Sequence, residues 1–210
     1  MKKILLIISV LTTVFILSIN VLATSFSHSA KHGLKSDETI TVNENSNNSL
    51  SSKPLSWYCK HMKSSARPNM GSEFLFINEL GGYYIGKDEP KIYLTFDAGY
   101  ENGNIEKILD VLKEKDVPGA FFILENLAVS NSELVKRMSD EGHLVCNHTA
   151  THKDITSMKN IDALSAELNR LNDICMEKCG VKVANYFRPP EGKFSEQSLE
   201  FINKLGYKTI

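Results

Sequence analysis

The sequence predicts an α/β fold in which helices cover a parallel sheet, and three observations support this. Short apolar runs typical of buried strands alternate with longer segments along the chain. In those longer segments the apolar residues recur every three or four positions, which is the spacing of one helical face. Residues able to do chemistry follow directly after three of the strands, at the edge where parallel sheets carry active sites. An open sheet and a (β/α) barrel both satisfy this pattern.

Five strands are expected, over Lys91–Asp97, Gly119–Leu124, His143–Asn147, Lys182–Phe187 and Gly206–Ile210. Four helices alternate with them, and their apolar faces are Ile105, Ile108, Leu109 and Leu112, then Leu134, Val135 and Met138, then Ile161, Leu164, Leu168, Leu171 and Cys175, and last Leu199, Ile202 and Leu205. Residues that favour helix ends support these boundaries. Asn131 or Ser132 caps the second helix and Ser195 the fourth, while Gly142 and Gly180 end the second and third.

Composition limits the class of protein. The chain has 210 residues, of which 42% are apolar and 23% charged, so a disordered, collagen-like or small disulfide-stapled protein is excluded. One globular domain, acting as a monomer, is expected. Lys and Arg number 24 against 25 Asp and Glu, which leaves no excess positive charge to hold a phosphate backbone. We therefore expect no nucleic-acid partner.

The first residues have the pattern of an export signal. Lys2 and Lys3 precede an almost continuous apolar stretch at residues 4–19, and residues 21–23 suit a signal peptidase. We interpret residues 1–23 as a signal peptide, or alternatively as an uncleaved anchor near the lower length limit for spanning a bilayer. In both cases the rest of the chain is exported, and only this segment would touch the membrane.

The next residues are predicted to be a flexible linker. Residues 24–53 are rich in Asn and Ser and carry almost no large apolar side chain, so they cannot bury enough surface to offset the entropy of ordering. From Pro54 onward aromatic residues become frequent. We therefore place the folded domain at residues 54–210.

The cysteines are interpreted as core residues. Cys146 lies in an apolar strand, and Cys175 and Cys179 are four residues apart on a predicted helix. The four cysteines of an exported chain would also permit disulfides. A metal site made of Cys146 and His148 is a further alternative, although it lacks the paired spacing of known Cys-His sites.

Four residues at three strand ends are candidates for chemistry. His148 and His152 are four residues apart, on one helical turn or a tight loop, so both imidazoles can point at one divalent ion such as zinc. Asp97 ends the first strand, where a carboxylate can act as a general base. Pro189 favours an extended conformation for Arg188, whose guanidinium can pair with Asp97, orient it and keep it ionised.

Each of these residues also has a structural alternative. The histidines can be surface residues that only form hydrogen bonds, Asp97 can cap the following helix, and Arg188 can make a strand-end salt bridge with no catalytic water beside it. A different enzyme class, a glycoside hydrolase that uses Asp97 and Glu101 as its carboxylate pair, leaves the histidines and the arginine without a role.

Taken in order, the motifs Thr95–Gly99, His148–His152 and Arg188–Gly192 resemble the first three motifs of the NodB-type polysaccharide deacetylases, carbohydrate esterase family 4. Within that family the chain is most similar to the delta-lactam-biosynthetic de-N-acetylases, on the runs Tyr100–Gly103, Ser56–Trp57 and Gly81–Tyr84. The resemblance covers residues 54–210 and implies a (β/α) barrel of the NodB type, of which about five strands are present.

The resemblance also implies a function. The enzyme would remove the N-acetyl group of N-acetylmuramic acid in a peptidoglycan glycan strand, leading to the muramic delta-lactam of spore cortex, on the wall or cortex side of the membrane. Asp97 would be the base and Arg188 the residue that tunes it. His148 and His152 would bind a divalent metal, expected to be zinc.

Two departures from the family pattern support an alternative. Most members carry a second Asp as third metal ligand at the position of Ala98, which cannot bind a metal. The later family motifs, including a general acid, would lie beyond Ile210, so the chain is expected to be truncated. The alternative is therefore a non-catalytic remnant that at most binds cell-wall glycan.

Overall fold

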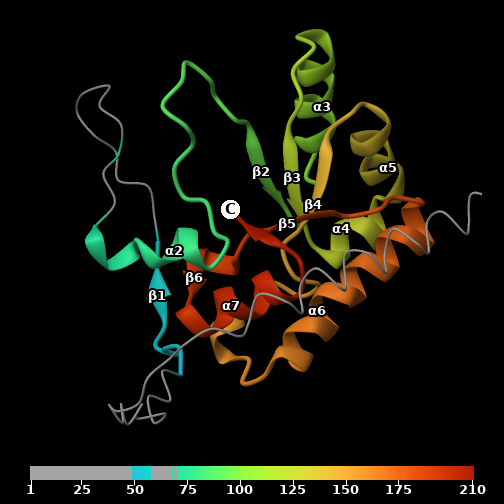
Figure 1. Cartoon of the computed structure of the whole chain (residues 1–210). Coiled ribbons are helices and arrows are strands. Elements are labelled where there is room, and N and C mark those ends of the chain that lie inside the picture. The colour runs from blue at the N-terminus through green and yellow to red at the C-terminus, as the bar shows by residue number, and fades with distance from the viewer. Residues whose placement is uncertain (1–48, 58–67, 69–70) are drawn as a thin grey trace, which may run out of the picture. The chain divides into compact units, whose positions relative to one another are not determined.

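A five-stranded parallel sheet forms the centre of the fold, with the strand order β2-β3-β4-β5-β7 (Figure 1). The computed structural model describes residues 49–57, 68 and 71–210. The predicted signal segment 1–23 and the predicted linker up to residue 48 lie outside the described residues. In the described part of the chain, no helix combines the length and the apolar composition needed to cross a membrane.

All five predicted strands are present. They are β2 Thr95–Ala98, β3 Ala120–Ile123, β4 Leu144–Asn147, β5 Ala184–Phe187 and β7 Lys208–Thr209. The first strand begins later than predicted, at Thr95. The carbonyl oxygen of Leu94 still accepts the N–H of Ala120 over 3.0 Å, but further back the chain leaves the sheet, and Ile92 is 89% exposed. The predicted α/β class with a parallel sheet is therefore confirmed.

The predicted helices are also present, as α3 Ile105–Glu114, α5 Ser132–Asp140, α6 Ile161–Ile174 and α7 Glu196–Lys204. A π-helical turn, Cys175–Cys179, continues α6 until Gly180, whose left-handed backbone (φ 65°) ends it. Ser195 caps α7 through a reciprocal pair of hydrogen bonds with Ser198.

Some elements were not predicted. Helix α4, Glu125–Ser130, is only six residues long and has no capping side chain. Helix α2, Phe76–Glu79, is shorter still. Among the described residues, three single 3-10 turns complete the helical elements, over Ser72–Phe74, Ile155–Ser157 and Pro190–Gly192. These elements lack the repeated apolar spacing that marks a longer helix in a sequence.

A two-stranded antiparallel ribbon joins distant parts of the chain (Figure 1). Strand β1, Leu55–Ser56, pairs with β6, Lys193–Phe194, and the N–H of Trp57 donates to the carbonyl oxygen of Gly192 over 3.0 Å. Around the ribbon, aromatic side chains including Trp57 and Phe194 form their own apolar cluster with α2 and α7. The ribbon thus holds the segment that follows Arg188.

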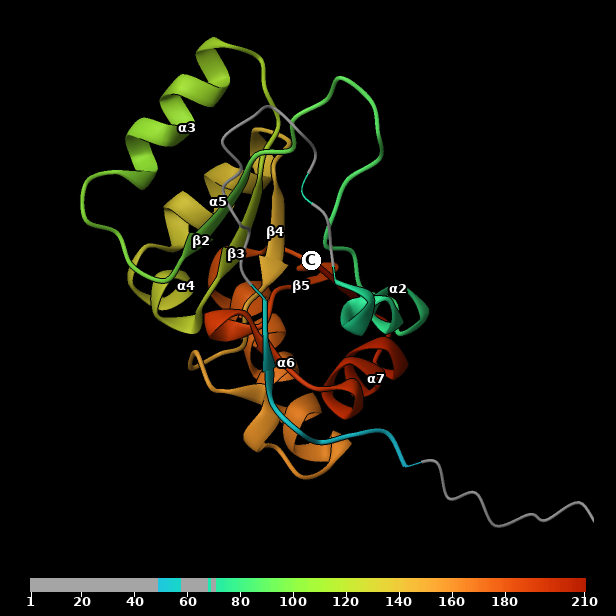
Figure 2. The ribbon, with the colours of Figure 1, turned by 90° about the vertical axis from the view of Figure 1, so that its left-hand side faces the viewer.

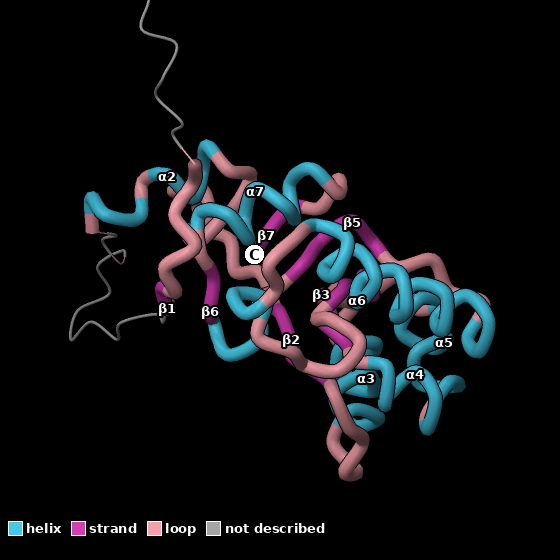
Figure 3. The backbone as a smooth tube through the Cα atoms, turned by 90° about the horizontal axis from the view of Figure 1, so that it is seen from below, coloured by secondary structure: helices cyan, strands magenta, loops and turns pink. Residues whose placement is uncertain are grey.

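The main core lies between the sheet and the helices that cover one of its faces (Figure 2 and Figure 3). Alternate strand residues such as Phe121 and Ile123 point into it and contact apolar side chains of α3, α4 and α5. A second cluster joins α6 and α7 around Phe187. Cys146, Cys175 and Cys179 are free thiols and buried, so the core role predicted for these three residues is confirmed.

Candidate active site

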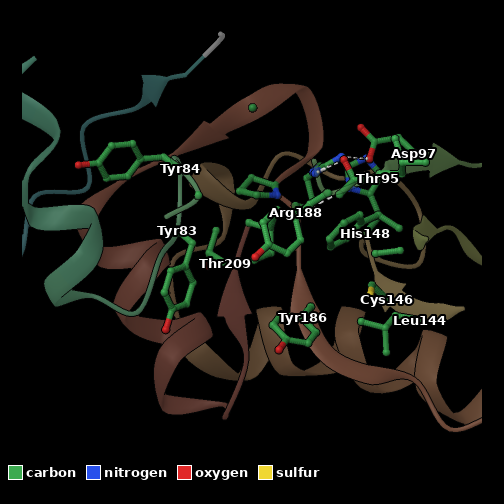
Figure 4. Close-up of a pocket in the computed structure, with 18 of the residues that line it drawn as sticks. Tyr83, Tyr84, Thr95, Asp97, Leu144, Cys146, His148, Tyr186, Arg188 and Thr209 are labelled. Atoms are coloured by element: carbon green, nitrogen blue, oxygen red, sulfur yellow. Dashed lines mark hydrogen bonds and ion pairs between the residues drawn. The ribbon is translucent and has the colours of Figure 1, made fainter. Parts of the chain in front are cut away.

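Three polar residues meet at the carboxyl edge of the sheet. Asp97 lies near the end of β2, His148 follows β4 and Arg188 follows β5. Neighbouring parallel strands end at the same edge, which is why residues far apart in the sequence come together here. All three line one pocket of about 1350 Å³ (Figure 4). His152 also lines this pocket.

The guanidinium of Arg188 is held by several groups at once. Its Nη1 donates to Oδ1 of Asp97 over 2.9 Å, and its Nη2 donates to Oγ1 of Thr95 over 2.9 Å. Its central carbon lies 4.3 Å from the centre of the Phe122 ring, a cation–π contact. The predicted pairing of Arg188 with Asp97 is therefore present. Asp97 keeps 51% of its side-chain area exposed and can still meet a substrate or a water molecule.

The two imidazoles lie close together. Their ring centres are 5.0 Å apart, and the rings are inclined at 67°. Nδ1 of His148 donates to the carbonyl oxygen of Arg188 over 2.7 Å, so in the neutral ring the lone pair is on Nε2. Burial lowers the pKa of His148, although that hydrogen bond acts in the opposite direction. His148 therefore presents an unprotonated nitrogen, the form that binds metal ions.

A tight loop, and not a helical turn, carries the two histidines. Thr149 and His152 both have left-handed backbones, with φ of 66° and 59°. The N–H of Thr149 donates to Oδ1 of Asn147 over 2.9 Å, and the N–H of Lys153 donates to Oγ1 of Thr149 over 3.2 Å. Such backbones are unfavourable for a β-branched residue and persist only where the surroundings impose them.

The side chain of Ala98 lies on the opposite face of β2 from Asp97. It is 5% exposed and belongs to the core cluster, because successive strand residues point to opposite faces. Among the described residues, no group of three His, Cys, Asp or Glu side chains is arranged to hold a metal ion. His148 and His152 still fit a divalent ion chemically, as two neutral imidazole donors that converge on one pocket.

The alternative metal site made of Cys146 and His148 is disfavoured. Cys146 is fully buried beneath the pocket, and burial raises the pKa of its thiol to about 12. Metals bind the thiolate, so a thiol held in its protonated form is a poor ligand.

Glu101 has a structural role. Its carboxylate accepts hydrogen bonds from the N–H groups of Gly103 and Ile105, the latter over 3.1 Å, at the beginning of α3. Glu101, and not Asp97, therefore caps this helix. The carboxylate pair of the glycoside-hydrolase alternative is not supported, because one of its two members is engaged by backbone donors.

Sequence reasoning missed two residues of the site. Thr95 is two positions before Asp97, so the two side chains lie on the same face of the strand. From this spacing the sequence could have predicted that a residue contacting Asp97 also contacts Thr95. Asn147 directly precedes His148 and shapes the histidine loop from the buried side of the sheet. Nothing in the sequence distinguishes this Asn from a surface residue at a strand end.

Comparison with known proteins supports a common origin with deacetylases. The model of the polysaccharide deacetylase family matches residues 85–210. The peptidoglycan-N-acetylmuramic acid deacetylase PdaA of Bacillus subtilis (strain 168) is 40% identical over 159 residues, which are 75% of this chain and 60% of that protein. The chain spans about three fifths of the length of the curated relatives it matches.

Solved structures give the same result for the fold. The structure of Bacillus subtilis PdaA, a family 4 carbohydrate esterase, is 39% identical with a TM-score of 0.72, and the match covers 76% of this chain and 69% of that one. A family 4 carbohydrate esterase from Bacillus anthracis is 37% identical with a TM-score of 0.66, and the match covers 77% and 74% of the two chains.

Proposed function

Because this chain belongs to the polysaccharide deacetylase family, we propose that it is a hydrolase that removes the N-acetyl group of N-acetylmuramic acid in peptidoglycan. The observation that carries the proposal is the ion pair of Arg188 and Asp97 beside two converging imidazoles. The substrate class is taken from the name of the Bacillus subtilis relative, a peptidoglycan-N-acetylmuramic acid deacetylase.

The proposed reaction is the hydrolysis of an amide bond. The carboxylate of Asp97 takes a proton from the attacking water, whose oxygen adds to the acetyl carbonyl carbon. The bond from that carbon to the sugar nitrogen then breaks, and acetic acid leaves, which loses its proton to solvent and becomes acetate. The leaving nitrogen takes up one proton, which the protonated Asp97 is placed to return. Arg188 keeps the carboxylate in one orientation throughout, through the bond to its Oδ1.

The reaction is proposed to depend on a divalent metal, which the chemistry of two imidazole ligands suggests is zinc. His148 and His152 would hold it. When bound, the ion would supply Lewis-acid polarisation of the acetyl carbonyl. The role of His148 in this chain is to present Nε2, and the carbonyl of Arg188 fixes the ring for that purpose.

The cellular role is proposed from the product. Deacetylation frees an amine on the muramic acid, and this amine can close on the lactyl carboxyl of the same sugar to give the muramic delta-lactam of spore cortex. The pattern of residues 1–23 supports export, so we place the enzyme on the wall or cortex side of the membrane. A monomer is sufficient for this role, because all the proposed site residues come from one chain.

The test is acetate release from glycan strands whose peptides have been removed. Intact peptidoglycan and chitooligosaccharides serve as comparison substrates, and mass spectrometry identifies the sugar that loses its acetyl group. Asp97→Asn is expected to abolish release. Glu101→Gln removes a carboxylate from the same loop, keeps an acceptor for the start of α3, and is expected to retain release.

Two results would overturn the proposal. Release that is unchanged in Asp97→Asn would contradict the role of the base. Binding of the glycan without any acetate release by the unaltered chain would favour the non-catalytic alternative, which the burial of Ala98 in the core supports.

A further inference from the structure

Asn147 is a fully buried amide directly before the first histidine. It is the last residue of β4, and its side chain lies on the helix-covered face of the sheet, away from the pocket. Leu168 of α6, whose carbonyl oxygen it contacts, is buried as well. A buried amide is costly unless its hydrogen bonds are satisfied, so a position like this one needs a reason.

The amide of Asn147 uses both of its donors and its acceptor. Nδ2 donates to the carbonyl oxygen of Leu168 over 3.0 Å and to Oδ1 of Asn172 over 3.1 Å. Oδ1 accepts from the N–H of Thr149 over 2.9 Å. Because both donors point at oxygens of α6, the amide cannot flip, and Oδ1 must face the loop. The helix thereby dictates which group Thr149 meets.

The network extends through Asn172 of α6 to Tyr207. Because Nδ2 of Asn147 donates to Oδ1 of Asn172, Nδ2 of Asn172 faces the hydroxyl of Tyr207 and donates to it over 2.7 Å. Tyr207 is itself buried and directly precedes β7. The two amides and the phenol thus connect the histidine loop to α6 and to the last strand described.

The main chain of Asn147 serves the second site segment. Its carbonyl oxygen accepts from the N–H of Arg188 over 3.1 Å, and the carbonyl of Arg188 in turn accepts from Nδ1 of His148. The same residue therefore contacts the histidine loop through its side chain and the arginine segment through its backbone. A shift of Asn147 would displace both together.

We propose that Asn147 is a positioning residue that holds Thr149 in its left-handed conformation and so makes His148 and His152 converge. The carbonyl oxygen of Leu168, which can only accept, fixes the orientation of its amide, and Asn172 accepts its second N–H. The inference rests on the proposed function only where it takes the two imidazoles to be metal ligands. The geometry of the loop is a separate property of the polypeptide.

The test compares zinc affinity among folded variants, with zinc itself as the probe and a chelator as competitor. Asn147→Ala is expected to lower the affinity about 10-fold to 100-fold, the range found for groups that orient metal ligands. Asn172→Ala should also lower the zinc affinity. Asn169→Ala is the matched control on α6, because Asn169 is exposed and bonds only Ser165, and it should bind zinc like the unaltered protein.

A second substitution separates positioning from general damage. Glycine adopts a left-handed backbone without steric cost, so Thr149→Gly added to Asn147→Ala is expected to restore most of the lost affinity. Near-ultraviolet circular dichroism verifies that each variant is folded. If Asn147→Ala does not fold, Asn172→Ala is combined with Thr149→Gly in its place. A folded Asn147→Ala with unchanged affinity, or no rescue by Thr149→Gly, would overturn the proposal.

A measurement without metal distinguishes this inference from the proposed function. The Nδ1 proton of His148, bonded to the carbonyl of Arg188, should exchange slowly with solvent in the unaltered protein and faster in Asn147→Ala. If the unaltered protein binds no zinc, the metal part of the proposed function fails, and the exchange rates still decide the inference. Equal rates in the two proteins would contradict it.

Discussion

Arg188 bonds to Asp97 across two intervening strands. The strands that carry them, β2 and β5, are separated in the sheet by β3 and β4, and the guanidinium reaches over the Phe122 ring of β3 to make the 2.9 Å contact. The aromatic face supports the charge from below, while Asp97 and Thr95 hold its two terminal nitrogens. A planar group with several donors suits this position better than a single ammonium.

Replacing Arg188 by Lys is therefore expected to impair the reaction. A single ammonium cannot bond Asp97 and Thr95 in the same geometry, so the carboxylate loses its fixed orientation. We expect kcat for acetate release to fall roughly 100-fold with little change in KM, the effect of a misplaced catalytic group. Thr95→Val should show a smaller loss of the same kind. Steady-state kinetics on peptide-stripped glycan measures both, and a kcat near that of the unaltered enzyme for Arg188→Lys would contradict the assigned role.

Removing divalent metal is expected to stop the proposed reaction without unfolding the chain. The two imidazoles lie at the pocket, outside the apolar clusters that form the core, so the fold does not need them bound. Dialysis against a chelator should abolish acetate release, and added zinc should restore it. Circular dichroism should show an unchanged spectrum during the treatment. Full activity in the chelated protein would exclude the proposed metal dependence.

His143 is expected to make stability depend on pH. It is buried, and its Nδ1 accepts the N–H of Gly119 over 3.1 Å, so the folded state needs the neutral ring. Burial lowers the pKa of His143 from its ordinary value of 6.5. Between that value and the lowered pKa the unfolded chain binds more protons, so stability should fall as the pH drops below about 6.5.

Urea unfolding at several pH values measures this effect. His143→Asn keeps an oxygen that can accept the N–H of Gly119 but cannot titrate, so the free energy of unfolding of this variant should lose the His143 part of the pH dependence. If the free energy of unfolding falls equally steeply with pH in the two proteins below pH 6.5, the His143 ring is not the group responsible.

Gly192→Ala should destabilise the protein more than the same change at Gly142. Both glycines have left-handed backbones, with φ of 63° and 84°. A Cβ at Gly192 would lie 2.6 Å from the carbonyl oxygen of Trp57, whereas nothing lies within 4 Å of one at Gly142. We expect the excess loss in the free energy of unfolding to be about 1–3 kcal/mol, because the ribbon must move. Equal losses, measured by urea unfolding, would mean that the ribbon adapts at no cost.

Sequence reasoning predicted the sheet and its long helices well. Apolar runs such as the one ending at Ile123 and the apolar stripe of α6 are local patterns, and burial follows them directly. The ribbon of β1 and β6 was not predicted, because each strand is two residues long and their pairing depends on distant residues. Helix α4 was missed for lack of length and of a cap.

The part of the site that lies at the ends of the strands was predicted from the sequence. Asp97 and Arg188 were expected to pair because both lie at the carboxyl ends of parallel strands, and they do. The role of Glu101 in capping α3 and that of Asn147 behind the histidine loop were not predicted, since both depend on which nearby backbone groups lack partners. Which backbone groups lack a hydrogen-bond partner can be seen only in the folded structure. The chemical roles of the site residues stay predictions.

The pairing of β1 with β6 has a consequence for the order in which the protein folds. Strand β1 leaves the ribosome before every other described strand, but its partner is made after four of the five sheet strands. Contacts between residues so far apart in the sequence form slowly, because a long loop must close before they are gained. Strand β1 therefore waits unpaired during most of synthesis, and the segment after Arg188 reaches its final position among the last steps of folding.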